Sequence, residues 1–420
     1  MTPHVGHRAA PPRAAWRVRM LALVSVLGPG LLAGLSDDDP AGITTYSVLG
    51  ADHGYQLLWV LLLSTVALVV FHNLGARMGV VTGQGLTGLI RQRYGVRAAG
   101  LAVVALVVAN VGTTCAEFAG IAAGFELFGV SRYVSVPLAA VVVSLLVLRG
   151  SFHRVEHILM ALATVFVAYV AAGLLGHPDW GQVARGLVVP TMPFDRDALL
   201  IATATVGTTL APWGLSFIQS YAVDKKLRPA DLRYERIDVV TGAVLTGVIG
   251  AFVVVACAST LHTRGVPIDT AADAARALEP VAGRLASGLF GIGLIGAGLL
   301  AAAILPLSTA YSVCEFTGYE AALDDSMRDA TLFYLTYVLV TGVAAAVVLV
   351  PGAPLIPILV LTQVLNAVLL LPLLAFMYGI SRDRDLMGPY TATAGAAGLY
   401  LATIAFIAAC VLGLFVLGLG

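Results

Sequence analysis

Three consecutive aspartates, Asp37 to Asp39, interrupt an apolar stretch near the start of the chain, directly before Pro40. A charged side chain at the centre of a bilayer costs roughly 2.5–3.5 kcal/mol on insertion scales, so three uncompensated carboxylates would cost on the order of 8–10 kcal/mol. We expect no Lys or Arg at the same depth, so a bound cation is the simplest compensation. The alternative, a wet loop before a later span, leaves the apolar residues 20–36 without a membrane environment.

Two apolar stretches carry helix-breaking residues near their middle. In one, Asp39-Pro40 is followed by Gly42, and in the other Ala211-Pro212 is followed by Gly214. Proline removes a backbone donor and clashes with the preceding turn, and a broken helix survives in lipid only where it lines a cavity or is buried in protein. In transporters built from inverted repeats the substrate lies where two broken helices meet. The two breaks therefore predict a binding site between them.

Oxygen-bearing side chains accompany both breaks, whereas Met, His and Cys are missing from their immediate neighbourhood. Thr208 and Thr209 precede the second break, and Gln363 lies in a later apolar stretch. Carboxylate, carbonyl and water oxygens suit magnesium, calcium and manganese. Glu117, in the third apolar stretch, has three open roles: a proton relay, a polar pair, or a lining residue of the ion route.

The composition requires a bilayer as the solvent of this chain. Hydrophobic residues make up 59% and charged residues 11%, against roughly 25% charged residues in soluble domains, and the mean hydropathy is +0.92. A span needs about 20 apolar residues. The predicted fold class is an all-α integral membrane protein with eleven transmembrane helices. The expected spans are 20–50, 56–78, 97–128, 133–149, 155–176, 197–222, 237–262, 285–314, 331–351, 355–379 and 391–418.

The two broken spans are five spans apart, which predicts two five-helix repeats of inverted topology with an eleventh helix appended. The expected organisation is a cytoplasmic tail (1–19), a first repeat (20–176), a second, inverted repeat (197–379) and the eleventh helix (391–418). With the N-terminus inside, 18 of the 24 Lys and Arg residues fall in cytoplasmic segments. The positive-inside rule then predicts a cytoplasmic N-terminus and an external C-terminus in the cell (inner) membrane.

Several other classes of protein lack support in this sequence. The net charge is zero, without a basic run typical of nucleic-acid binding. The four cysteines are isolated in apolar surroundings and are expected to be small buried side chains. We find no zinc-protease, nucleophile-elbow or phosphate-loop motif, so we expect neither an enzyme nor a resident cofactor. The expected partners are the lipid bilayer and a divalent metal ion substrate; the oligomeric state is not readable.

Segments along the whole chain resemble the NRAMP divalent-metal transporter family. GPGLLAGLSDDDPAGITTYSVLGADHGYQLLWVLLLS resembles its first two helices, and LGARMGVVTGQGLTGLIRQRYG the approach to its third. Further matches in the expected order are HPDWGQVARGLVVP, LRYERID, SGLFGIGLIGAGL and LVLTQVLNAVLLLPLLAFMYGISRDRDLMG. The resemblance implies the eleven-helix inverted-repeat fold that many amino-acid transporters share.

Departures from the family motifs occur at the metal site. Where the family has Asp-Pro-Gly-Asn, this chain keeps Asp39 and carries Gly42 in place of the ligand asparagine. Where the family has Met-Pro-His, the ligand methionine is replaced by Ala211. The two histidines of that helix fall on Trp213 and Ile218.

The third-helix acid pair is also reduced, because it aligns to Thr114 and Glu117, whereas Gln363 matches a tenth-helix glutamine that can approach the ion. Removal of the soft sulfur removes a preference for later transition metals. The extra volume suits magnesium, which usually keeps several waters. This pattern resembles the NRAMP-related magnesium transporters, a branch that carries magnesium without proton coupling.

The expected function is therefore uptake of partly hydrated magnesium, and also manganese, by alternating access without proton coupling. The expected metal-site residues are Asp39, Asp38, Gly42, Thr208, Ala211 and Gln363, with Trp213, Thr209 and Asp37 shaping the cavity and Glu117 as a possible relay. Three alternatives stay open: a proton-coupled manganese or iron transporter of the NRAMP type, an amino-acid transporter of the same fold, and a non-transporting receptor or membrane enzyme. Three aspartates would repel the carboxylate of an amino acid.

Overall fold

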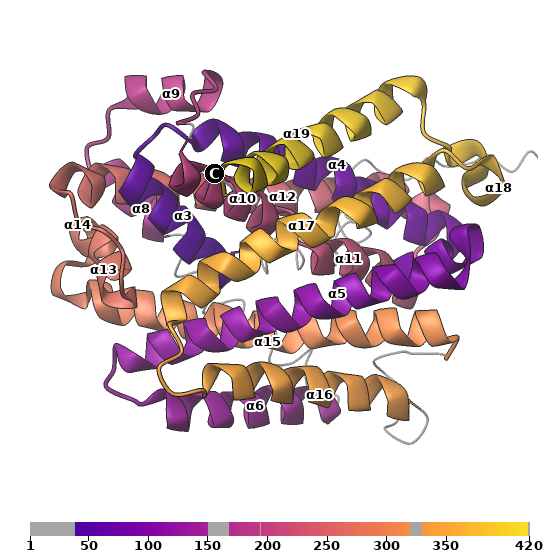
Figure 1. Cartoon of the computed structure of the whole chain (residues 1–420), viewed down its shortest axis with the longest axis horizontal. Helices are drawn as coiled ribbons and strands as arrows, with labels where there is room; N and C mark the ends of the chain where they lie inside the picture. Colours follow the sequence, from indigo (N-terminus) through magenta and orange to yellow (C-terminus); the bar gives the residue numbers. More distant parts are fainter. Residues whose placement is uncertain (1–37, 150–167, 194, 320–329, 419–420) are drawn as a thin grey trace, which may run out of the picture.

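The computed structural model describes residues 38–149, 168–193, 195–319 and 330–418, and the regular elements in this part of the chain are helices (Figure 1). Eight helices or helix runs among these residues are long and apolar enough to cross a bilayer. The predicted all-α membrane class is therefore confirmed. The number of eleven spans stays a prediction, because much of the first and fifth expected spans lies outside the described residues.

The helices follow one another with short connections. The first part of the chain forms α3 (Pro40–His53), α4 (Leu58–Thr82), α5 (Leu86–Glu126), α6 (Arg132–Leu148), α8 (Ala168–Leu175) and α9 (Trp180–Val188). The second part forms α10 (Arg196–Thr209), α11 (Pro212–Asp224), α12 (Leu232–Thr260), α13 (Ala271–Ala275), α14 (Glu279–Ala282), α15 (Ala286–Thr317), α16 (Thr331–Val348), α17 (Leu355–Ser381), α18 (Arg384–Met387) and α19 (Ala394–Gly418).

Helix α5 begins earlier than the sequence predicted. The expected span began at residue 97, but the helix starts at Leu86 and its backbone leaves the helical conformation only at Gly95, with φ 85° and ψ 175°. A positive φ is open to glycine at little cost because glycine has no Cβ. The segment 86–94 is therefore a separate helical piece that places the N-terminus of α5 next to the ends of α4 and α15.

Helices α5, α6, α15 and α16 form a four-helix bundle in which every helix contacts the others (Figure 1). Through α5 and α15 this bundle also contacts α3 and α11. The long helices α5 and α15 approach closely through Gly124 and Gly291, because a Cβ on either glycine would lie about 3 Å from the carbonyl oxygen of the other. Small residues allow such close contact between helices in membranes. This scaffold provides one wall of the site described below.

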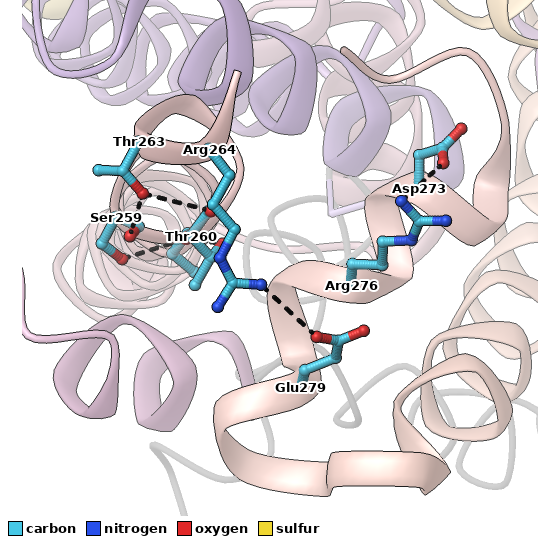
Figure 2. A network of polar contacts seen from close by, with 8 residues as sticks. Ser259, Thr260, Thr263, Arg264, Asp273, Arg276 and Glu279 are labelled. Atoms are coloured by element: carbon cyan, nitrogen blue, oxygen red, sulfur yellow. Dashed lines mark hydrogen bonds and ion pairs between the residues drawn. The ribbon is translucent and has the colours of Figure 1, made fainter. Parts of the chain in front are cut away.

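The helix bundle has two opposite ends, and each is named after the helix connection that it contains. The α3–α4 face contains the turn Gly54–Leu57 together with α9, α13 and α14, and the α4–α5 face contains the turn Gly83–Gly85 and α18 (Figure 1). On the α3–α4 face, Arg264 pairs with Glu279 at 3.8 Å and Arg276 with Asp273 at 3.7 Å (Figure 2). The first of these pairs joins the segment directly after α12 to α14, and the second joins α13 to the residue that follows it.

The outer helices expose apolar side chains, as expected for contact with lipid. On α19, Leu412, Phe415 and Val416 are all more than half exposed. The four cysteines are buried, which confirms their predicted environment.

Candidate functional site

The first break is built around the start of α3. Asp39 is the N-cap residue, with extended backbone angles, and its side chain accepts a hydrogen bond from the backbone N–H of Gly42. Pro40 follows at the first helical position, where a missing N–H is tolerated. The same Asp-Pro sequence that would break a continuous helix therefore begins a new one, with its positive dipole end at the carboxylate.

Pro40 is wedged between the scaffold helices. A Cβ on Gly120 of α5 would lie 2.2 Å from the Pro40 Cβ, and a Cβ on Gly298 of α15 would lie 3.2 Å from its Cγ. Both glycines are therefore required by the close approach of the ring. This contact places the carboxylate of Asp39, which is 4% exposed, deep in the protein beside the C-terminal part of α5.

The second break separates α10 from α11 over Leu210 and Ala211. Ala211 has extended backbone angles, φ −80° and ψ 145°, and provides no side-chain cap for α11. Backbone groups at both half-helix ends are consequently free of the usual capping side chain and can face a ligand. The predicted break of the sixth span is confirmed.

The first break is joined to the second through side-chain and backbone contacts. The Tyr46 hydroxyl of α3 lies 2.8 Å from the Thr209 hydroxyl, which itself donates to the Thr205 carbonyl. A Cβ on Gly207 would lie 1.9 Å from the backbone oxygen of Gln363, so α10 and α17 pack backbone to backbone. Helix α3 also contacts α17. Tyr46 and Thr209, which are 163 positions apart in the sequence, thus lie in one buried region.

Several buried oxygen atoms in this region have no hydrogen-bond donor. Both carboxylate oxygens of Asp38, both of Glu117 and the hydroxyl of Thr208 lack a partner, although these residues are at most 3% exposed. The carboxyl group of Glu117 lies against that of Asp39. Buried acceptors without donors are costly, and two adjacent carboxylates repel each other. A cation, or a proton shared between the acids, would satisfy them.

Gln363 is held by a polar chain that the sequence analysis missed. Its side-chain oxygen accepts from Asn366, whose amide also donates to the Thr113 hydroxyl of α5 at 2.8 Å. On the same face of α5, Asn110 donates to Thr309 of α15 at 2.9 Å. The sequence held a signal for this chain: Gln363 and Asn366 are three residues apart inside an apolar span, so both lie on one face of the helix.

The remaining predicted residues have diverse surroundings. Trp213 is 1% exposed and its carbonyl accepts from the Ser308 hydroxyl at 3.1 Å, so it fills the space after the second break. Gly42 and Ala211 can offer only backbone groups. Asp37 lies outside the described residues. Among those residues, no group of three or more His, Cys, Asp and Glu side chains is placed to hold a metal ion, so hydroxyl and backbone oxygens would have to complete any shell.

A cavity of about 670 Å³ opens elsewhere, on the α3–α4 face between the end of α3, α9 and the end of α12. It is lined by His53, His177 and His262 among others, and by none of the predicted site residues. The breaks themselves are closed over by protein. The predicted site residues that the structure describes are therefore buried.

The fold and the paired half-helices define a class of α-helical membrane proteins, and solved structures share this fold. The chain superposes on a manganese transporter of Eremococcus coleocola, solved with an aromatic bis-isothiourea compound, with a TM-score of 0.78 at 19% identity, covering 97% of this chain and 88% of the other. A nucleobase-cation-symport-1 family transporter, Mhp1, gives 0.56 at 14% identity, with 93% and 91% covered. The predicted fold class is confirmed.

Proteins with similar sequences identify the family within this class. The model of the Natural resistance-associated macrophage protein-like family (Nramp) matches residues 30–417, and the chain belongs to that family. It is 29% identical to the divalent metal cation transporter MntH of Burkholderia ambifaria, over 91% of this chain and 88% of the relative. The MntH of Verminephrobacter eiseniae is also 29% identical, over 97% and 93%.

Proposed function

We propose that this protein transports divalent metal ions across the inner membrane, with the ion bound between the two breaks. The observation that carries the proposal is the set of buried oxygens without donors at Asp38, Glu117 and Thr208, next to Asp39. A cation between the Asp39 and Glu117 carboxyl groups would compensate their charge, whereas an amino-acid carboxylate would be repelled. The names of the relatives support a metal cargo and argue against the receptor and enzyme alternatives.

We infer a preference for hard ions, magnesium as well as manganese. Manganese is the cargo named for the similar solved structure, and oxygen ligands suit both ions. Magnesium is proposed because Ala211 and Gly42 replace longer side chains, which leaves oxygen groups and room for retained water. Asp39 and Asp38 would supply charge, the carbonyls near Thr208 and Ala211 would complete the shell, and Gln363 would join when the site occludes.

The proposed mechanism is alternating access without proton coupling, in the predicted orientation with a cytoplasmic N-terminus. The N-terminal halves of the first and sixth spans would move against the scaffold of α5, α6, α15 and α16, and α11, the second half of the sixth span, would follow. Thr114 donates to the Asn110 carbonyl of its own helix and, unlike the family's second acid, cannot carry a proton to solvent as a carboxylate does. Trp213 and Ile218 likewise stand where imidazoles would titrate.

A second candidate, a proton-coupled manganese transporter, is favoured by one contact. The Asp39 and Glu117 carboxyl groups lie together without another donor, so they could share a proton that leaves when the metal binds. The two candidates differ in what happens to pH during uptake. Metal entry into proteoliposomes with an internal pH dye separates them: no acidification supports the uncoupled mechanism, and acidification in proportion to metal entry supports the coupled one.

A further inference from the structure

Helix α11 is fastened along its length to neighbouring helices by side-chain hydrogen bonds. The bonds fall at every turn of the half-helix and reach α15 and the α4–α5 turn. They are Ser308 to the Trp213 carbonyl (3.1 Å), Ser216 to Ser312 (2.7 Å), Gln219 to the Gln84 carbonyl (3.0 Å), Ser220 to Glu315 (2.5 Å) and Tyr311 to Asp224 (3.1 Å). Helix α11 is therefore held by specific polar contacts in addition to apolar packing.

Glu315 joins three helices at one point. Its carboxylate accepts from the Thr87 hydroxyl at 2.8 Å and from backbone N–H groups of Thr87 and Gly88, so it caps the N-terminus of α5. It also fills the space beside Gly85, where a Cβ would overlap its oxygens. The helix dipole stabilises a negative charge in this position. The hydrogen bond from Ser220 connects this carboxylate to α11.

A row of buried polar groups leads from the metal site toward Glu315. Glu117, Thr114 and Asn110 lie on one face of α5, three or four residues apart, and Thr309 and Ser312 follow on α15. Asn110 contacts Thr309 at 2.9 Å, and the Thr87 hydroxyl donates to the Ser312 carbonyl at 3.0 Å. We call these groups the polar seam. From Gly298, which touches Pro40, to Glu315 the seam runs about 25 Å along α15.

Polar groups buried in membrane spans mark ion and substrate pathways. The polar seam is covered by α11, and the Asn110 side-chain oxygen within it has no hydrogen-bond partner. We propose that the seam is the route by which the ion leaves the buried site toward the α4–α5 face, and that Glu315 is a positioning residue that holds α11 closed over it. This inference rests on the proposed transport function and on the predicted orientation, which puts this face in the cytoplasm.

The hydrogen bonds of Glu315 indicate how the route would open. Its bonds to Thr87 and Gly88 stay within the scaffold, whereas its bond to Ser220 crosses to α11. When α11 moves away, the carboxylate therefore stays on the N-terminus of α5 and one of its oxygens faces the opened seam. A hydrated divalent cation leaving Asp39 would then meet first the Asn110 amide, then hydroxyl groups, and finally this carboxylate.

Thiol labelling of the seam tests the closure without any metal. Thr114→Cys is placed in a protein whose four native cysteines are replaced, because the Thr114 hydroxyl bonds only within α5. A small charged methanethiosulfonate is added on the α4–α5 side of proteoliposomes. Loss of a hydrogen bond to a charged group should raise the open population, so Ser220→Ala and Glu315→Gln should each label about tenfold faster.

Ser64→Ala is the matched control, because Ser64 is fully buried and its hydroxyl bonds only to the Val60 carbonyl of its own helix. Its labelling rate should equal that of the parent. Equal rates in Ser220→Ala, Glu315→Gln and Ser64→Ala would overturn the closure by Glu315. Faster labelling from the α3–α4 side instead would place the route on the opposite face and would also overturn it.

A disulfide gives the reverse test. Ser216→Cys and Ser312→Cys replace hydroxyl oxygens 2.7 Å apart and should cross-link α11 to α15 on oxidation. The cross-linked protein should lose labelling at Thr114→Cys and manganese uptake. Reduction, followed by removal of the reducing agent before labelling, should restore both, and the protein with Ser216→Cys and Ser312→Cys alone gives the labelling of those two thiols to be subtracted. Uptake that continues through the cross-linked protein would overturn the seam while leaving the proposed transport intact. Gated labelling without uptake of any metal would support the closure and overturn the proposed cargo.

Discussion

At the residue scale, the choice between oxygen and sulfur atoms beside Asp39 decides which metal ions the site prefers. Asp39 is the residue whose role could be predicted best from the sequence, because an acid before proline inside an apolar span has few alternatives. Its contact with Glu117 could not be predicted, since it depends on how Pro40 packs between Gly120 and Gly298. Asn366 was missed because an amide in a span is usually a helix-to-helix bond.

Restoring sulfur at the second break should change ion selectivity. In Ala211→Met the thioether would lie at the start of α11, and soft ligands favour later transition metals. We expect cadmium uptake to rise about tenfold relative to magnesium. Uptake of both ions by the variant and the parent in proteoliposomes measures this ratio, and Ala222→Met, a buried alanine near the other end of α11, is the control. An unchanged ratio would mean that Ala211 lies away from the ion.

The polar chain on Gln363 should show coupling between Thr113 and Asn366. Asn366→Leu leaves the buried side-chain oxygen of Gln363 without its donor and removes one bond of the Thr113 hydroxyl, which should cost about 1–3 kcal/mol of stability. Thr113→Val removes the same bond between Thr113 and Asn366, so the double variant should lose less than the sum of the two single variants. Thermal unfolding of the four proteins in detergent measures the coupling. Additive losses would show that the 2.8 Å bond contributes nothing.

At the scale of elements, the helices were more predictable than their contacts. The Pro-Gly pairs correctly placed the second break and the start of α3, because proline has local consequences for the backbone. The early start of α5 was missed because residues 86–94 are too polar to read as a span, although Gly95 allows them to form a separate helical segment. The side-by-side packing of α10 and α17 involves residues far apart in the sequence.

Packing of α10 on α17 should be sensitive to one methyl group. Gly207→Ala would put a Cβ 1.9 Å from the Gln363 carbonyl oxygen, and backbone cannot move aside as a flexible side chain can. We expect a loss of about 1–3 kcal/mol, the usual cost of overpacking. Gly342→Ala on α16 is the control, since its Cβ would meet no atom within 4 Å, and should be neutral or stabilising. Equal melting temperatures would refute the close contact.

At the scale of the whole molecule, composition alone established the membrane class, because an interior and surface this apolar are incompatible with water. The family followed from short segments in order along the chain. The division into repeats at 20–176 and 197–379, and the orientation, stay predictions. Neither can be obtained from helix packing, since a bundle has the same contacts whichever face is cytoplasmic.

The orientation should be visible by labelling from one side. A single cysteine at Lys226, which follows α11 on the α4–α5 face, should react with a membrane-impermeant maleimide only after intact cells are opened. A cysteine at exposed Arg264, on the α3–α4 face, should react in intact cells. The opposite pattern would reverse the proposed orientation and place the polar seam on the external side.

We propose that oxygen groups around Asp39 bind the hard divalent ions that this protein carries across the membrane. The most direct test is entry of magnesium and of manganese into proteoliposomes, read by separate indicators with an internal pH dye, for the parent, Asp39→Asn and Asp179→Asn, an exposed cap of α9. The account predicts entry of both ions without acidification, lost in Asp39→Asn and kept in Asp179→Asn. Manganese entry with matching acidification and no magnesium entry would contradict it.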